Sequence, residues 1–441
     1  MLEFRADPEQ INLELITDFL DKHENAMARY SRLQRYYEGY HDILWRETQD
    51  KNKPNNKIVS NFPGYITDVN IGYFLGEPVS YTASDDDEDM LKTLQEIFDF
   101  NDEQDENLDI GKKCSIKGHA FELFFMDEAA NIRFNSMGPE NMFVVYSTSV
   151  IKEMLLAVRR WPDAVNEEIE NIEVYDSVGV TVYRKSESGM QLVEERTHNF
   201  GDVPVVEYLN NDERQGDFEK ALTIIDAYDK AQSDSCNDFE YFADAYLKIV
   251  NMSGTQESDV NAMKRDRVIL VDSDGDVEWV VKDINDAAVE NFKSRLQEDI
   301  HRFSKTPNLS DEKFAGNVTG IALRFKLWGL EQNASVKERK FKRGLQRRIE
   351  LICNALEVKG KPYDWRKIQA TFSRNIPAVL PEIVDMIQKL RGLVSRQTLI
   401  SQLPFIEDPA LEEARVEEEE MGRDLDMYGY GPPEVEETEE G

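Results

Sequence analysis

Three long helical segments in the second half of the chain constrain its fold more than any other feature. Segment 319–357 carries apolar residues at helical spacing along its whole length, and at 1.5 Å per residue it would be about 58 Å long. Segment 218–251 would form a helix of about 50 Å, and 287–305 a shorter one. The chain has 441 residues, too few to cover all three helices fully. We therefore favour burial against neighbouring copies in a ring, with a helical domain that packs internally as the alternative.

A β-hairpin is predicted between the helical segments 218–251 and 287–305, because runs 266–272 and 276–283 are joined through Ser-Asp-Gly. Upstream, the region between Lys117 and Leu209 is rich in strand-forming residues and predicts an antiparallel meander. Its expected strands are 119–127, 131–136, 141–147, 153–161, 169–177, 180–185 and 190–198.

The remaining segments are mostly helical in pattern. Helices are expected over 8–48 and 90–100, with a short strand at 79–82 between them. Asp217 is expected to cap the helix that follows it. After a strand over 368–374, two short helices follow, one begun by Pro381 and the other capped by Ser395.

The net charge of the chain is −35, from 87 acidic and 52 basic residues. A protein that grips DNA by neutralising phosphates should carry a basic excess, so ordinary DNA binding is disfavoured. Solubility explains the acidity in one interpretation. In the other, the surface is built to avoid sticking to a polyanion.

No residue pattern indicates catalysis, a cofactor or a bound metal. The 3 cysteines are far apart and the 5 histidines lie in unrelated local patterns, which disfavours a disulfide framework, a zinc site and histidine-based catalysis. Aspartates alternate at 272–276 as in a calcium loop, but Val277 stands where that loop needs glycine. A P-loop signature is missing as well. We expect a non-enzymatic protein, with a metal-dependent nuclease as the alternative from another class.

The chain shows no sign of a membrane segment or a secretory signal. Its first ten residues are charged from Glu3 onward, and no apolar run approaches the roughly 20 residues that span a bilayer. We expect a soluble intracellular protein.

Four stretches resemble the portal proteins of long-tailed phages that infect Gram-positive bacteria. They are 56–81, 218–305, GIALRFKLWGLEQNASVKERKFKRGL (320–345) and 372–419, of which the last two are the most specific. The resemblance covers most of the chain and is weakest over 83–216.

This resemblance implies an α+β portal fold in a ring oligomer. The fold would have an antiparallel β-rich wing, a long-helix stem, a β-hairpin clip, a tunnel loop and an α-helical crown. In chain order the implied parts are the wing (1–216), a stem helix (217–250), the clip (251–285), a second stem helix (286–305), the tunnel loop (306–319), a long supporting helix with a wing strand (320–371), the crown (372–420) and an acidic flexible tail (421–441).

The resemblance also assigns candidate roles to three sets of residues, and the charge pattern of the sequence assigns a role to a fourth, a basic strip within an acidic chain. The tunnel loop that narrows the channel would include Lys305, Pro307, Asn308, Ser310, Asp311, Lys313, Gly316 and Asn317. A channel wall that repels phosphates, so that DNA can slide, would include Asp226, Asp229, Asp234, Asp238 and Asp244. Partner docking on the clip would involve Arg265, Arg267, Asp272, Asp274, Asp276 and Trp279. A basic strip expected to pair between subunits, in preference to DNA, comprises Lys337, Arg339, Lys340, Lys342 and Arg343.

The partners that the resemblance implies follow from a position at the portal vertex of the virion, after assembly in the host cytoplasm. A twelve-fold ring would pass double-stranded DNA. The terminase large subunit, and later a head-completion or adaptor protein, would dock on the clip, while major capsid and scaffolding proteins would contact the wing. Another head–tail connector component or a scaffold protein is the alternative within the same class.

Overall fold

The computed structural model of the chain describes residues 3–48, 54–83, 87–166, 168–187, 189–243, 246–250, 276–280, 286–310, 320–375 and 380–403, with residues 256, 258, 261, 406 and 412–416. Contacts divide the chain into two units. The first comprises Met1–Ser310 and Lys326–Asn375, and the second comprises Asp311–Phe325 and Ile376–Gly441. Each unit is described by itself.

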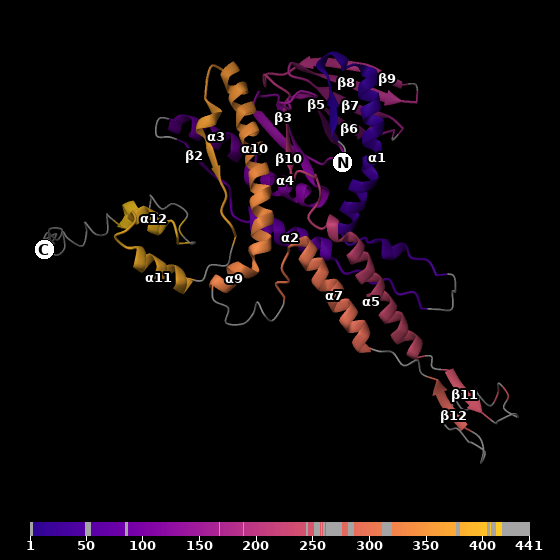
Figure 1. Cartoon of the computed structure of the whole chain (residues 1–441). Coiled ribbons are helices and arrows are strands. Elements are labelled where there is room, and N and C mark those ends of the chain that lie inside the picture. The colour runs from indigo at the N-terminus through magenta and orange to yellow at the C-terminus, as the bar shows by residue number, and fades with distance from the viewer. Residues whose placement is uncertain are drawn as a thin grey trace, which may run out of the picture. The chain divides into compact units, whose positions relative to one another are not determined.

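In the first unit, most helices come before or after a run of consecutive strands, β3 to β10 (Figure 1). Its helices are α1 (Leu13–Tyr37), α2 (Phe62–Leu75), α3 (Glu88–Phe100), α4 (Glu103–Lys117), α5 (Leu222–Ala243), α7 (Asp286–Ser304) and α10 (Trp328–Val358), with short 3-10 turns at Pro8–Gln10, Asp42–Trp45, Glu219–Ala221 and Trp365–Lys367. Its strands are β1 (Phe4–Ala6), β2 (Ser80–Thr82), β3 (His119–Met126), β4 (Ile132–Met137), β5 (Met142–Ser147), β6 (Met154–Pro162), β7 (Glu170–Tyr175), β8 (Gly179–Ser186), β9 (Gly189–Thr197), β10 (Val205–Leu209), β11 (Tyr246–Val250), β12 (Asp276–Val280) and β13 (Gln369–Thr371).

The predicted strands between Lys117 and Leu209 are confirmed, but they form two sheets instead of one meander. Strands β5 to β9 are consecutive and antiparallel, and β1 joins them in parallel with β5. Strands β3 and β4 pair with β10 in a separate sheet. The first six residues of β3 are all buried, so β3 behaves as a central strand that needs a partner on each side.

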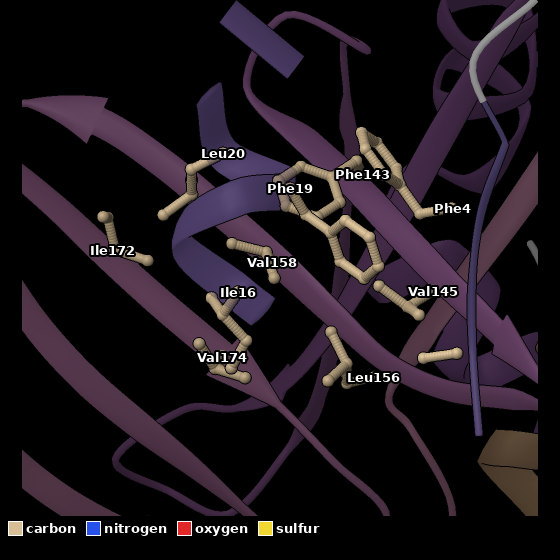
Figure 2. Packing of buried hydrophobic residues seen from close by; sticks show 11 residues of the cluster. Phe4, Ile16, Phe19, Leu20, Phe143, Val145, Leu156, Val158, Ile172 and Val174 are labelled. Atoms are coloured by element: carbon tan, nitrogen blue, oxygen red, sulfur yellow. The ribbon is translucent and has the colours of Figure 1, made fainter. Parts of the chain in front are cut away.

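One hydrophobic core of the described residues lies between α1 and the six-stranded sheet. Ile16, Phe19 and Leu20 of α1 point into this core, and Phe4 of β1 closes it (Figure 2). Asn12 begins the helix, because its side-chain oxygen accepts the Leu15 amide at 2.9 Å. Apolar residues on both faces of the sheet are buried, since a second cluster joins it to the β10-β3-β4 sheet. This framework packs α1 against the strands.

Helices α2 and α4 had no counterpart in the sequence analysis. α2 starts at Asn61, whose side chain accepts the Gly64 amide at 3.1 Å, and it is buried around most of its circumference. A helix with no polar face shows no helical period. α2 packs closely on α4 at Gly111, where an added Cβ would lie only 2.4 Å from a methyl carbon of Leu75.

Two of the long predicted helices are shorter than expected. The helix predicted over 218–251 ends at Ala243, and its last part is strand β11. The helix predicted over 319–357 is divided at Leu327 into α9 (Gly320–Lys326) and α10. The helix predicted over 287–305 is confirmed as α7, which packs beside α5.

An ionic cluster is buried where α10 crosses β3 and α4. Arg348 is 0% exposed, with its guanidinium 2.6 Å from a Glu103 oxygen and 2.8 Å from a Glu122 oxygen. The Tyr208 hydroxyl donates to Glu122 at 2.9 Å. α10 lies so close to strand β10 that an added Cβ on Gly344 would lie 2.3 Å from the ring of Tyr208, a residue of that strand. The cluster ties the long helix to the sheet and to α4.

Candidate functional site

A row of polar side chains on α5 holds the segment that leads from α1 to α2. We name this row the polar ladder; it consists of Asp226, Asp229, Ser233, Asp234 and Asn237. Asp226, Asp229, Ser233 and Asn237 recur every three or four positions and so lie on one face of the helix, with Asp234 beside Ser233 at the edge of that face.

Each rung of the polar ladder has a partner in residues 32–60. Asp226 accepts the Tyr36 hydroxyl at 2.5 Å and Arg32 at 3.2 Å. Asp229 lies 2.5 Å from His41 Nδ1 and accepts the Ser60 amide at 2.8 Å. Ser233 accepts the backbone amide of Ile58 at 2.9 Å, and Asp234 accepts the guanidinium of Arg46 at 2.6 Å. Asn237 accepts the backbone amide of Asn56 at 2.7 Å.

This arrangement bears on the aspartates expected in the channel wall. Asp229 is 0% exposed, so its carboxylate cannot face a bore, and its place in the wall is withdrawn. Asp226 and Asp234 are partly exposed but each is paired with an arginine. Asp238 is half-buried near the end of α5, and Asp244 lies outside the described residues. The polar ladder therefore has a structural role within the subunit.

The expected tunnel loop begins beside α2. The Tyr65 hydroxyl donates to the Pro307 carbonyl at 2.8 Å and accepts the Leu309 amide at 2.8 Å. Asn70 donates to the Thr306 hydroxyl at 2.7 Å, and both residues are buried. Lys305, Pro307, Asn308 and Ser310 thus belong to the first unit. Asp311, Lys313, Gly316 and Asn317 lie outside the described residues.

The start of α10 packs against the end of α7 at the same place. Lys305 has a φ of 56°, in the left-handed region that ends a helix. Gly329 lies against it, with an added Cβ 3.4 Å from the Lys305 carbonyl oxygen. Asn333 donates to the Ser304 carbonyl at 3.2 Å. Both ends of segment 306–328 are therefore fixed beside each other.

The hairpin between α5 and α7 differs from the prediction in its strands. β12 pairs antiparallel with β11, with Trp279 opposite Leu247 and Asp276 opposite Val250. The hairpin thus includes residues expected at the end of the stem helix. The predicted strand 266–272 lies outside the described residues, as do Arg265, Arg267, Asp272 and Asp274.

The basic strip of α10 divides into internal and external residues. Lys337 is buried and paired with Asp217. Asp217 does not cap a helix as expected, because the helical turn Glu219–Ala221 begins after Phe218 and α5 begins at Leu222. Because Lys337 is used inside the subunit, its expected place between subunits is withdrawn. Lys340 pairs with Asp212, and Lys342 with Glu338 at 2.8 Å.

Arg339 and Arg343 are the exposed guanidinium groups of this strip. Over the described part of the chain, neither forms an ion pair. They follow Trp328 and Val336, which are also exposed, along one face of α10. This face carries unpaired positive charge beside exposed apolar surface.

A cavity of about 750 Å³ lies beside α10 and is lined by charged groups that are mostly paired with one another. Arg214 pairs with Glu207, whose pKa is about 2: burial raises it, but hydrogen bonds from His119 and Arg214 outweigh burial. We assign this cavity no ligand.

The segment before the second unit is held by α10 and α2. Arg374 binds Glu331 at 3.0 Å and Glu338 at 2.7 Å, and Phe372 stacks on Phe74. Residues 372–375 therefore belong to the first unit, although the crown was expected to start at 372.

The second unit contains α9 up to Phe325, α11 (Leu380–Leu390) and α12 (Arg396–Ile400). α11 and α12 confirm the two short helices predicted there. Ser395 caps α12, because its hydroxyl accepts the Thr398 amide at 3.3 Å.

Within the described ranges, no helix combines the length and apolar character that crossing a bilayer requires. Among the same residues, no three His, Cys, Asp or Glu side chains are grouped to hold a metal ion.

Tyr65 and Asn70 are the residues of this region that the sequence analysis missed. Asn70 offered a weak signal, since it is a lone amide in the apolar stretch 62–75. The Tyr65 hydroxyl gave none, because aromatic residues are frequent throughout α2.

Comparison with known proteins gives consistent results. The family model described as "Phage portal protein, SPP1 Gp6-like" matches residues 16–424. The portal protein of Bacillus phage SPP1 is 27% identical over 414 residues, covering 88% of this chain and 81% of that protein. The portal protein of Clostridium phage phiCD119 is 24% identical over 445 residues, covering 92% and 97%. A solved structure titled "Neck of empty GTA particle computed with C6 symmetry" has a TM-score of 0.46 at 10% identity, covering 76% and 88%, and we base no argument on it.

Proposed function

This chain belongs to the SPP1 Gp6-like family of phage portal proteins, and from that premise we propose that its copies form a twelve-fold ring through which double-stranded DNA is packaged and ejected. The observation that carries the proposal is the family match over residues 16–424, which includes the stem helices, the hairpin and α10. The ring occupies one vertex of the virion capsid, and it supplies a passage without catalysing a reaction.

Each part of the chain has a task in this proposal. Helices α5 and α7 form the stem, and the β11–β12 hairpin projects as the clip on which the terminase large subunit and later a head-completion protein dock. Residues beyond Ser310 form the tunnel loop. The wing, built on the two sheets, contacts capsid and scaffolding proteins. The helices of the second unit form the crown.

The acidity of the chain suits such a passage. A negatively charged wall repels phosphates, so DNA slides without strong contacts that release counterions. Because Asp229 is buried and Asp226 and Asp234 are paired, we assign the wall to acidic residues outside the polar ladder.

Imaging the purified full-length protein tests the proposal. Mass measurement and negative-stain microscopy should show annular particles with a central opening. A compact monomer under all conditions of capsid assembly would overturn it. Incubation of the same preparation with duplex DNA and Mg²⁺ or Mn²⁺ checks the nuclease alternative, and DNA cleavage would contradict a purely structural role.

The exposed face of α10 supports a second prediction, that Arg339 and Arg343 contact a neighbouring copy. The double variant Arg339→Glu/Arg343→Glu should weaken ring assembly by at least about 100-fold, because like charges placed across an interface cost several kcal/mol. Its subunit should keep its thermal midpoint, since neither side chain is used in an ion pair within the described part of the subunit.

Sedimentation analysis of the assembled and free fractions measures this effect. Arg366→Glu is the matched control, because Arg366 is exposed at another place in the first unit. Equal assembly of the double variant and the control would remove α10 from the interface.

A further inference from the structure

We propose that Tyr65 is a positioning residue that fixes where the chain leaves the first unit toward the tunnel loop. This inference rests on the proposed role of the segment beyond Ser310. It concerns one hydroxyl group, which binds the chain on both sides of Asn308.

The hydroxyl of Tyr65 is saturated by these contacts. It donates to the Pro307 carbonyl oxygen and accepts the Leu309 amide, each at 2.8 Å. Pro307 has no N–H of its own to offer. The Ser310 amide binds the Asn308 side chain at 3.2 Å, a contact within the stretch itself that does not attach it to a helix. Tyr65 is therefore the attachment of this short stretch to a helix.

The chain before Pro307 is held by other groups. Thr306 is fully buried, accepts Asn70 at 2.7 Å, and has its carbonyl oxygen 2.9 Å from His301 Nδ1. Asn333 binds the Ser304 carbonyl. Loss of the Tyr65 hydroxyl should thus release residues 307–309 and leave Ser304–Thr306 in place.

The ring of Tyr65 has a separate packing role. It meets the His301 ring edge-on, with centroids 5.8 Å apart and planes at 88°. Phenylalanine preserves this contact and removes only the hydroxyl. Tyr65→Phe is therefore a selective test of the two hydrogen bonds, and the fold of the subunit should survive it.

Hydrogen exchange on assembled full-length rings measures the effect. In Tyr65→Phe, the Leu309 amide should exchange about fivefold faster, the effect expected from loss of one hydrogen bond, while peptides that end before Thr306 should not change. Tyr37→Phe is the matched control, because it removes a hydroxyl that binds α2 at Asp68, at 3.1 Å, one turn away from Tyr65 and without a contact to Leu309 among the described hydrogen bonds. It should leave the Leu309 amide unchanged.

DNA packaging by the same rings, with the phage's own packaging motor, completes the test. Faster exchange at Leu309 together with at least about twofold slower packaging supports the inference. Unchanged exchange at Leu309 overturns the positioning role of Tyr65. Faster exchange with unchanged packaging overturns the assignment of the following segment to the channel, which separates failure of the proposed function from failure of the contact.

Discussion

Replacing Arg348 by methionine should destabilise the first unit by about 3–5 kcal/mol, the usual cost of removing one partner of a buried ion pair. Arg348 and Glu122 are both 0% exposed, and Glu103 is almost as deeply buried. Methionine fills much of the same space but leaves two carboxylates without their counter-charge. Urea unfolding of the subunit, before ring assembly, measures the loss of free energy.

Arg343→Met provides the control for this prediction. It makes the same change five positions earlier on α10, where the side chain is exposed and forms no ion pair in the described part of the chain. Its effect should stay within about 0.5 kcal/mol. Equal unfolding midpoints for the two variants would contradict the importance of the buried cluster.

The cost of Arg348→Met should depend on pH. Burial already raises the pKa of Glu122, although Arg348 opposes this, and the variant removes that opposition. A carboxyl whose folded pKa lies above its unfolded pKa makes folding take up protons, so stability falls as pH rises through that interval. The difference between variant and native protein should therefore be smaller in mildly acidic buffer than at neutral pH. An opposite slope would contradict the assignment of the charge.

Deleting the hairpin, residues 246–280, should abolish DNA packaging while rings still form. The strands β11 and β12 pair with each other in a two-stranded sheet, and neither joins another described strand. α5 and α7 pack side by side, so a short glycine–serine linker can replace the hairpin. The expected loss follows from the proposed docking of the packaging motor on this element.

Two measurements on the deletion variant separate the outcomes. Negative-stain images should show rings of unchanged diameter, and immobilised rings should no longer retain the terminase large subunit. Packaging at the native rate would remove the hairpin from the docking surface. Loss of rings would instead make the hairpin part of the subunit interface.

The sequence predicted the strands between Lys117 and Leu209 well, because each is short, rich in β-branched or aromatic residues and bounded by polar turns. Their division between two sheets was not predictable in the same way. β3 pairs with β10, whose residues lie more than 80 positions later, and the choice depends on burial of β3 on both sides. Pairing across such separations leaves no local signal.

The errors in the helices have comparable causes. α2 is apolar around most of its surface and so lacks a helical period. Residues 246–250 continue the period of α5, yet they form β11 because β12 offers a partner. Tertiary pairing overrides local preference here.

The family could be recognised from sequence, and the resemblance seen in four stretches is confirmed by the match over residues 16–424. Individual side chains were harder. Asp229 fits the spacing of a helix face, but the spacing does not reveal that His41 and Ser60 cover that face. Lys337 was placed outside for the same reason, since its partner Asp217 is remote in sequence.

The polar ladder has a consequence for exchanging parts between relatives. α5 and residues 32–60 recognise each other through matched donors and acceptors, several of them buried. A chimaera that imports a foreign α5 alone would leave these groups without partners, so both segments must be inherited together. In evolution, recombination between related phages should accordingly favour exchanges that transfer the whole N-terminal half along with this helix.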